Sequence, residues 1–195
     1  MQHSAEYHTN LPQIDKSWTL FLDRDGVINE DVVDDYVKNR EEFIFREGTL
    51  TALRILKPLF ARIVIVSNQR GVEKGLMTAN DLQDITEFML SAIQLADGNI
   101  DRVFYCTSIN NDNPNRKPNS GMAEQAKAQF PEINFSKSIM VGNMPGDMLF
   151  GKKIGAFTVY LPTRAEESPK ENTVDIVYKD LLAFANDLAQ KTEYP

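Results

Sequence analysis

Short runs of apolar and β-branched residues alternate along the chain with longer segments whose apolar positions recur every three or four residues. The short runs are typical of buried strands, and the longer segments are typical of amphipathic helices. The pattern predicts strands over Trp18–Leu22, Arg62–Val66, Arg102–Tyr105, Ser138–Val141, Phe157–Tyr160 and Ile176–Tyr178. It predicts helices over Leu50–Leu59, Ala79–Ala96, Met122–Gln129, Met148–Ile154 and Leu181–Ala189.

The second predicted helix has the clearest signals. Thr78, followed by Asp81 three residues later, is typical of a capping box at a helix start. Leu82, Ile85 and Met89 then fall on one helix face, which we expect to face the core. Strands that alternate with helices of this length form βαβ units. We therefore predict an α/β fold, Rossmann-like, with a parallel sheet between helices on both faces.

The chain has 195 residues, enough for one domain with its own core. We expect residues 1–16 to be a polar, loosely ordered leader and residues 17–195 to form a single domain. The connection from Gly26 to Glu47 is too long for an ordinary loop between a strand and a helix. We expect this segment to fold over a functional site as a minimal cap.

The net charge of −7 argues against a nucleic-acid partner, because nucleic-acid binders usually carry a basic face. No apolar run approaches the length of a membrane span. The polar leader lacks the basic and apolar regions of a signal peptide. We therefore expect a cytoplasmic monomer with neither a nucleic-acid nor a membrane partner.

Residues that are scarce narrow the chemistry further. Cys106 is the one cysteine, and the two histidines, His3 and His8, both lie in the leader. An intrachain disulfide is impossible, and a Ser-His-Asp triad or a His/Cys zinc site is disfavoured. Carboxylates, lysine, arginine and hydroxyls remain as chemical groups for an enzyme.

Polar side chains gather where four of the predicted strands end. Asp23 and Asp25 follow the first strand, and Ser67–Gly71 follows the second. The loop after the third strand ends in Arg116–Pro118, and Gly142–Asp147 follows the fourth. Ligands of open α/β sheets bind beyond the carboxyl ends of the strands. The four clusters together would supply acids, metal ligands and phosphate-binding cations at one edge.

Each cluster alone has a purely structural interpretation. Asp25-Gly26 can be a turn, Ser67-Asn68 a helix cap, Arg116-Lys117 a solvated loop, and Asp147 an N-cap. An EF-hand is excluded, because Gly26 directly follows the second acid. Four such coincidences at one sheet edge favour a functional site.

The order Asp-x-Asp-Gly, Ser-Asn, Arg-Lys-Pro and Gly-x-x-x-x-Asp resembles the haloacid dehalogenase (HAD) superfamily of phosphotransferring hydrolases. Its closer similarity is to the small-cap branch of histidinol-phosphatases and D-glycero-D-manno-heptose 1,7-bisphosphate phosphatases. The resemblance runs from about Trp18 to Leu161. The matching segments are Phe21–Asn29, Asp35–Val37, Ser67–Gly75, Arg116–Met122 and Val141–Gly155.

The resemblance implies a Mg²⁺-dependent phosphatase that acts on a small phosphate ester. Asp23 would be the nucleophile that forms an aspartyl-phosphate. Asp25 would protonate the leaving alcohol and then activate water. Ser67 and Lys117 would hold the phosphoryl oxygens, and Asn68 and Arg116 would bind the substrate.

The same resemblance implies that Mg²⁺ sits among the Asp23 carboxylate, the Asp25 backbone carbonyl and the loop after the fourth strand. The family usually has Asp where Asn143 stands, and an amide oxygen binds Mg²⁺ without the charge. Either Asn143 or Asp147 is therefore the expected ligand from this loop. Many relatives also carry a Cys/His zinc loop before Arg-Lys-Pro, but Thr107–Asn115 contains neither residue type, so we expect no zinc.

The first expected substrate is heptose bisphosphate, because Asn68-Gln69, Gly71 and Gly75 resemble that group's loop. Histidinol phosphate is the second. A protein of a different class, which binds phosphate without catalysis because Asn143 weakens the metal site, is the main alternative. A nucleic-acid 3′-phosphatase is disfavoured by the net charge of −7.

Overall fold

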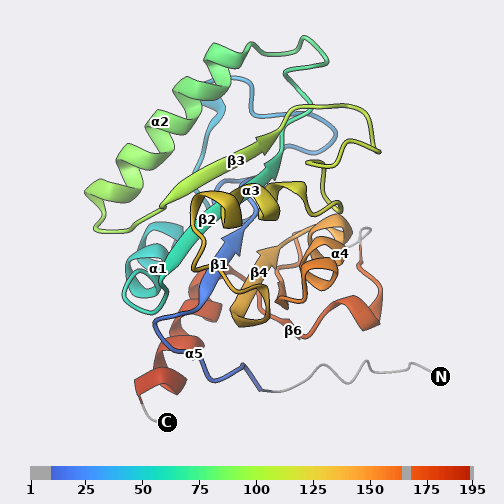
Figure 1. The fold of residues 1–195 in the computed structure, drawn as a ribbon. Helices are drawn as coiled ribbons and strands as arrows, with labels where there is room; N and C mark the ends of the chain where they lie inside the picture. The colour runs from blue at the N-terminus through green and yellow to red at the C-terminus, as the bar shows by residue number, and fades with distance from the viewer. Residues whose placement is uncertain (1–9, 164–167, 194–195) are drawn as a thin grey trace, which may run out of the picture.

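A six-stranded sheet with helices on both faces forms the protein (Figure 1). The structure is a computed structural model that describes residues 10–163 and 168–193. All paired strands are parallel and lie in the order β3-β2-β1-β4-β5-β6. The strands are β1 (Thr19–Leu22), β2 (Arg62–Asn68), β3 (Arg102–Cys106), β4 (Ser138–Gly142), β5 (Phe157–Tyr160) and β6 (Ile176–Val177). The predicted α/β fold is confirmed.

Two layers of helices cover the sheet. The helices are α1 (Thr49–Leu56), α2 (Ala79–Leu95), α3 (Gly121–Gln129), α4 (Pro145–Ile154) and α5 (Leu181–Glu193). Leu20 and Leu22 share one apolar cluster with α1, α2 and α5, whereas Phe21 joins a second cluster with α3 and α4. Successive side chains of a strand point to opposite faces, so β1 is apolar throughout because both of its faces are buried.

The boundaries of several elements differ from the predicted ones. The strand β2 continues through Ser67 and Asn68, because Asn68 pairs with Cys106 of β3. The helix α4 begins at Pro145, three residues earlier than expected, since proline is pre-organised for the first helical position. The predicted capping box is present, with Thr78 Oγ1 accepting from Asp81 N at 3.1 Å.

The long connection after β1 folds back on itself and contains the short 3₁₀ helix η1 (Arg40–Glu42). The N–H of Arg46 donates to the carbonyl of Ile28 at 3.0 Å, which closes the segment at its base. The Phe43 ring packs edge-on against Phe88 of α2, with centroids 5.9 Å apart. The segment 26–47 is therefore anchored on the α2 side of the sheet, and we call it the flap.

The expectation of a loosely ordered leader falls, for residues 1–9, outside the described residues. Within the described part, Leu11 is buried and Ile14 packs against the main core. Two further 3₁₀ helices are η2 (Phe135–Lys137) and η3 (Glu171–Thr173). None of the helices in residues 10–163 and 168–193 is long and apolar enough to cross a membrane.

The strand register explains where the site lies. Leu22, the last residue of β1, aligns with Ile65 of β2 and Val141 of β4. The residues that follow these three positions therefore emerge at one level, beyond the centre of the sheet. From β1 the chain continues to β2 and β3 on one side of the sheet, and it then crosses to β4 on the other side of β1. The strand order thus reverses between β1 and β4, and open α/β sheets bind ligands in the crevice at such a point.

Candidate active site

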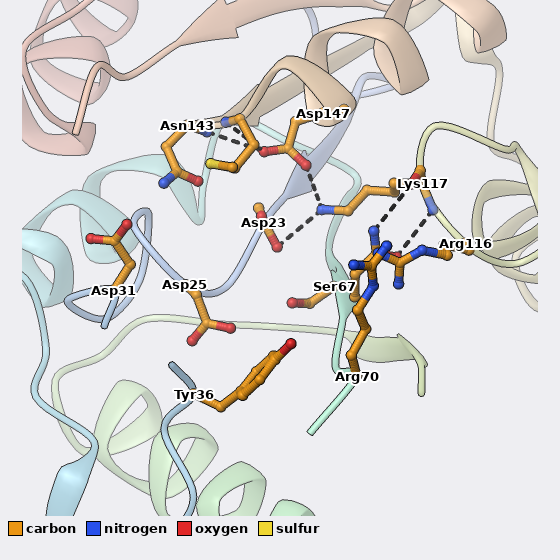
Figure 2. A pocket seen from close by; sticks show the side chains of 13 residues that line it. Asp23, Asp25, Asp31, Tyr36, Ser67, Arg70, Arg116, Lys117, Asn143 and Asp147 are labelled. Carbon is orange, nitrogen blue, oxygen red and sulfur yellow. Dashed lines mark hydrogen bonds and ion pairs between the residues drawn. The ribbon is translucent and has the colours of Figure 1, made fainter. Parts of the chain in front are cut away.

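A cavity of about 330 Å³ opens at this edge of the sheet (Figure 2). All eight residues that the sequence singled out line it, together with two residues of the flap, Asp31 and Tyr36. The full lining is Asp23, Asp25, Asp31, Tyr36, Ser67, Asn68, Arg70, Arg116, Lys117, Asn143, Met144, Gly146 and Asp147. Residues more than a hundred positions apart in the chain thus meet in one place.

Lys117 joins two carboxylates at the base of the cavity. Its Nζ lies 3.0 Å from Asp23 Oδ1 and 2.6 Å from Asp147 Oδ1 (Figure 2). The three side chains are 2%, 10% and 3% exposed, respectively. One lysine does not balance two buried acids, so the base of the cavity favours a further cation.

The excess of buried negative charge shifts the pKa values of both Asp23 and Lys117. Burial and the negative charge of Asp147 raise the pKa of Asp23 to about 7, although Lys117 opposes the shift. Burial alone would lower the pKa of Lys117, but the charges of Asp147 and Asp23 outweigh it and raise the pKa. Lys117 is therefore a cation at neutral pH.

Asp23 is held by its position at the end of β1. Its backbone N–H donates to Val141 O at 3.0 Å, which continues the β1–β4 pairing by one residue. The N–H of Arg24 donates to Asp23 Oδ1 at 2.7 Å. Both this bond and the Lys117 ion pair fall on Oδ1, so the described residues leave the second carboxylate oxygen for a ligand or a reaction.

Asp25 is oriented by three side chains, none of which the sequence analysis assigned to the site. Its Oδ1 accepts from Arg24 Nη2 at 2.8 Å and Asn29 Nδ2 at 2.9 Å, and its Oδ2 accepts from Gln69 Nε2 at 2.7 Å. Burial alone would raise the pKa of Asp25, but the Arg24 charge and these hydrogen bonds outweigh it and lower the pKa. The carboxylate is thus ionised in this arrangement.

Arg24 is fully buried, with a relative exposure of 0%. A buried guanidinium needs a buried or partly buried anion, and Asp25 supplies it. The available signal was an arginine placed between two acids at the end of an apolar strand. Because Arg24 directly follows a strand that is buried on both faces, its position argues against a side chain that reaches solvent. An ion pair with a neighbouring acid was therefore to be expected.

Asn68 lines the cavity and also contacts the backbone of Lys117. Its Oδ1 accepts from Lys117 N at 3.0 Å, and its Nδ2 donates to Lys117 O at 3.1 Å. Both ends of the amide therefore hold the backbone of the lysine. The hydroxyl of Ser67, which is buried, accepts from Gln69 Nε2 at 3.0 Å and lines the cavity.

The loop after β4 gives its two polar side chains different surroundings. Asp147 Oδ2 accepts from the backbone N–H groups of Asn143 at 3.2 Å and Met144 at 3.0 Å. Asn143 Nδ2 donates to Thr163 Oγ1 at 2.9 Å, but its buried Oδ1 has no donor among the described residues. An unpaired buried acceptor costs about 1–3 kcal/mol. The loop N–H groups hold Oδ2 of Asp147 and Lys117 holds its Oδ1, so the oxygen of Asn143 is the one left for a ligand.

The oxygen atoms that Asp23 and Asn143 leave unoccupied suit a magnesium ion. Within the described residues, no three His, Cys, Asp or Glu side chains gather in a cluster suited to a metal. A cation at this site would take oxygen ligands of mixed kinds, from the Asp23 carboxylate and the Asn143 amide. Mg²⁺ prefers oxygen ligands of this sort and retains several of its waters, so a complete protein cage is not needed.

Two arginines form the opposite wall of the cavity (Figure 2). Arg70 Nη2 and Arg116 Nε both donate to Asn111 Oδ1, at 2.7 Å and 3.3 Å. Arg116 Nη1 also donates to Ser108 O at 3.1 Å. Burial and the nearby charge of Arg70 lower the pKa of Arg116, but a guanidinium stays charged in proteins. The sequence analysis did not assign Arg70, which doubles the positive charge at this wall.

Comparisons with known proteins agree with this geometry. The family model described as "Polynucleotide kinase 3 phosphatase" matches residues 20–189. A D-glycero-D-manno-heptose-1,7-bisphosphate 7-phosphatase of Chlorobaculum tepidum is 34% identical over 160 residues, covering 76% of this chain and 80% of that protein. The chain belongs to the haloacid dehalogenase superfamily. The predicted family, and with it the prediction of a phosphoric monoester hydrolase, is confirmed.

Two further members of the superfamily match nearly the whole chain. A D-glycero-alpha-D-manno-heptose-1,7-bisphosphate 7-phosphatase of Campylobacter jejuni is 31% identical over 176 residues, 90% of this chain and 98% of that one. The crystal structure of a D,D-heptose 1,7-bisphosphate phosphatase from B. bronchiseptica, complexed with magnesium and phosphate, superposes with a TM-score of 0.79. It is 28% identical, and the match covers 89% of this chain and 99% of that one.

Proposed function

We propose that this HAD phosphatase removes a phosphate from a sugar bisphosphate, through an aspartyl-phosphate on Asp23. The observation that carries the proposal is the buried triad in which Lys117 joins Asp23 and Asp147 beside the unpaired oxygen of Asn143. Heptose bisphosphate is the first candidate substrate, since the relatives at 31% and 34% identity are named for it.

Asp23 is the nucleophile of the proposed reaction. The carboxylate oxygen that Lys117 does not contact attacks phosphorus, and the bond from phosphorus to the sugar oxygen breaks. Lys117 holds the other oxygen at 3.0 Å and offsets the negative charge that gathers as two anions approach. Asn68 keeps the lysine in place through its two backbone bonds.

Asp25 is the acid and base of the proposed reaction. Because its carboxylate is ionised in the free site, it first takes up a proton from solvent and then gives that proton to the departing sugar oxygen. As a base again, it takes a proton from the water that hydrolyses the aspartyl-phosphate. Arg24, Asn29 and Gln69 hold the carboxylate, whose side chain remains 31% exposed at the cavity. Ser67 binds the phosphoryl group, and Arg116 with Arg70 binds the second phosphate.

Mg²⁺ is the proposed cofactor, held by the Asp23 carboxylate, the Asp25 backbone carbonyl and the Asn143 amide oxygen. Asp147 would contribute through its hold on Lys117 and the loop. The ion supplies positive charge that lets an anionic carboxylate meet an anionic phosphate. Zinc is not part of the proposal, because residues 107–115 contain neither cysteine nor histidine.

The remaining parts of the proposal concern partners and location. We propose a cytoplasmic monomer that binds neither nucleic acid nor membranes, with the net charge of −7 as support. Histidinol phosphate is the second candidate substrate. A phosphate-binding protein without catalysis is the alternative from another class, and a 3′-phosphatase of nucleic acids is a third, because the matching family model is described by that activity.

The experiment is a phosphate-release screen with and without Mg²⁺. The panel contains heptose 1,7-bisphosphate, sugar monophosphates, histidinol phosphate and a 3′-phosphorylated oligonucleotide. We expect the fastest Mg²⁺-dependent release from the sugar bisphosphate, and none from the Asp23→Asn variant, whose amide is a poor nucleophile of the same shape. Release from no compound would favour the non-catalytic protein, and near-normal release by Asp23→Asn would remove Asp23 from the mechanism.

A further inference from the structure

The Asn143 side chain has two different ends, and only one of them can bind a cation. An amide presents an oxygen that accepts and an NH₂ group that only donates. A carboxylate in the same place would offer oxygen on both sides. A metal site that uses an asparagine therefore needs something that keeps its NH₂ group turned away from the ion.

Thr163 is placed to do this. Asn143 is 2% exposed, and its Nδ2 donates to Thr163 Oγ1 at 2.9 Å. Its Oδ1, at the other end of the amide, has no donor among the described residues. The NH₂ group is thus bonded on the side away from the cavity, and the oxygen is left on the cavity side (Figure 2).

The backbone holds both residues in this relation. The N–H of Leu161, two residues before Thr163, donates to Gly142 O at 2.9 Å, so the segment after β5 runs beside the segment after β4. The N–H of Asn143 donates to Asp147 Oδ2 at 3.2 Å. Gly26 closes the remaining side of the amide, since a Cβ there would lie 2.0 Å from Asn143 Nδ2.

We propose that Thr163 is a positioning residue of the metal site, which acts by fixing the orientation of the Asn143 amide. With a cation on Oδ1, the NH₂ group must find an acceptor on its other side, and the Thr163 hydroxyl is that acceptor. Without it, the buried NH₂ group is better placed toward the carboxylates of the cavity, which is the orientation that repels a cation. The inference rests on the proposed Mg²⁺ site.

The test measures Mg²⁺ binding by calorimetry, without substrate, on the full-length protein. Thr163→Val keeps the shape of the side chain and removes the hydroxyl. We expect the dissociation constant for Mg²⁺ to rise about 10-fold, the lower end of what the loss of a group that orients a metal ligand costs. Thr163→Ser, which keeps the hydroxyl, should bind like the wild-type protein.

A second background separates orientation from packing. In Asn143→Asp both ends of the side chain are oxygens, so the further change Thr163→Val should barely alter Mg²⁺ binding. An equal loss in both backgrounds, or no loss in either, overturns the inference. Urea unfolding in EDTA checks that each variant is folded, and Thr163→Ala replaces the valine variant if that one is not.

The outcomes also separate this inference from the proposed function. A wild-type protein that binds no Mg²⁺ overturns both. A wild-type protein that binds Mg²⁺ as tightly as Thr163→Val does overturns only the role of Thr163.

Discussion

Replacing Lys117 by methionine should destabilise the protein more than any single surface change. The substitution keeps the length of the side chain and removes the charge that lies 3.0 Å from Asp23 and 2.6 Å from Asp147. Both carboxylates are buried and would face each other without a cation. The prediction concerns the free energy of unfolding in the absence of Mg²⁺.

The magnitude follows from burial. Removing one partner of a buried ion pair costs about 3–5 kcal/mol, and here one lysine serves two acids, so the upper end of that range is expected. This is a large share of the total stability of a domain, which is about 5–15 kcal/mol. The pair of Lys152 and Asp175, 2.5 Å apart and 33% and 18% exposed, provides the control. Lys152→Met should cost no more than about 1 kcal/mol, because the pair is partly solvated and Thr158 N still donates to Asp175.

The loss in Lys117→Met should also depend on pH. The pKa of Asp23 is already raised to about 7, and Lys117 is one of the groups that lower it. A carboxyl whose pKa is raised in the folded state contributes its full stability below its unfolded pKa and loses that contribution as the pH rises through the folded value. Without Lys117 the folded pKa rises further, so the variant loses more stability at about pH 8 than at about pH 5.

Urea unfolding in EDTA, followed by the fluorescence of the single tryptophan, measures both effects. Trp18 packs partly buried against the main core, so its emission reports on unfolding. A loss below about 1 kcal/mol at about pH 8, equal to that of Lys152→Met, would refute the reasoning that these charges are desolvated. A loss that is the same at both pH values would refute the assignment of the shifted pKa to this triad.

Two further predictions concern the metal site. Gly26→Ala and Gly155→Ala both place a side chain at φ +79°, but only at Gly26 would the new Cβ clash, at 2.0 Å from Asn143 Nδ2. Gly155→Ala should lose about 1–2 kcal/mol of stability from backbone strain alone, and Gly26→Ala should lose more because of the added clash. Only Gly26→Ala should need more Mg²⁺ for half-maximal phosphate release; equal Mg²⁺ requirements would contradict the clash. The raised pKa of Asp23 leaves its carboxyl group protonated below about pH 7. Below that pH, Mg²⁺ binding should therefore release a proton from Asp23, and the affinity for Mg²⁺ should weaken as the pH falls. Calorimetry at about pH 6 in two buffers of different ionisation enthalpy detects that proton, and identical apparent enthalpies would argue against it.

The fold class could be predicted because it depends on the hydrophobic pattern within short stretches of sequence. The ends of the strands could not, because they depend on pairing with residues far away in the sequence. Strand-length apolar runs that alternate with helical periods leave few arrangements other than a parallel sheet. The end of β2, by contrast, depends on Cys106, which pairs with Asn68 across the sheet. No window of sequence around Asn68 contains that partner.

The site also combines features that the sequence predicts with contacts that it does not. The motif order pointed to Asp23, Lys117 and Asp147, which the structure brings together at the base of the cavity. The roles assigned to these residues stay predictions. The contacts between them were not predictable, since they depend on side-chain directions across distant segments. Asn68 is predicted to bind the substrate, and that role stays a prediction; its hold on the backbone of Lys117, 49 residues away, could not be foreseen. The role of Arg70 depends in the same way on Asn111 in another loop.

The division of charge in the cavity explains why the site suits an ester with a second anionic group. Asp23, Asn143 and Asp31 lie together on one side of the pocket, and Arg70 and Arg116 lie on the other (Figure 2). The oxygen-rich side attracts a cation and repels phosphate until that cation is bound. The arginine side attracts phosphate at all times. A substrate with two phosphates can therefore be held at the arginines while its other phosphate meets the nucleophile, whereas a monophosphate held at the arginines has nothing to place at Asp23. The ratio of kcat/KM for a bisphosphate to that for its monophosphate should consequently fall in Arg70→Met and Arg116→Met, while kcat/KM for the monophosphate changes little.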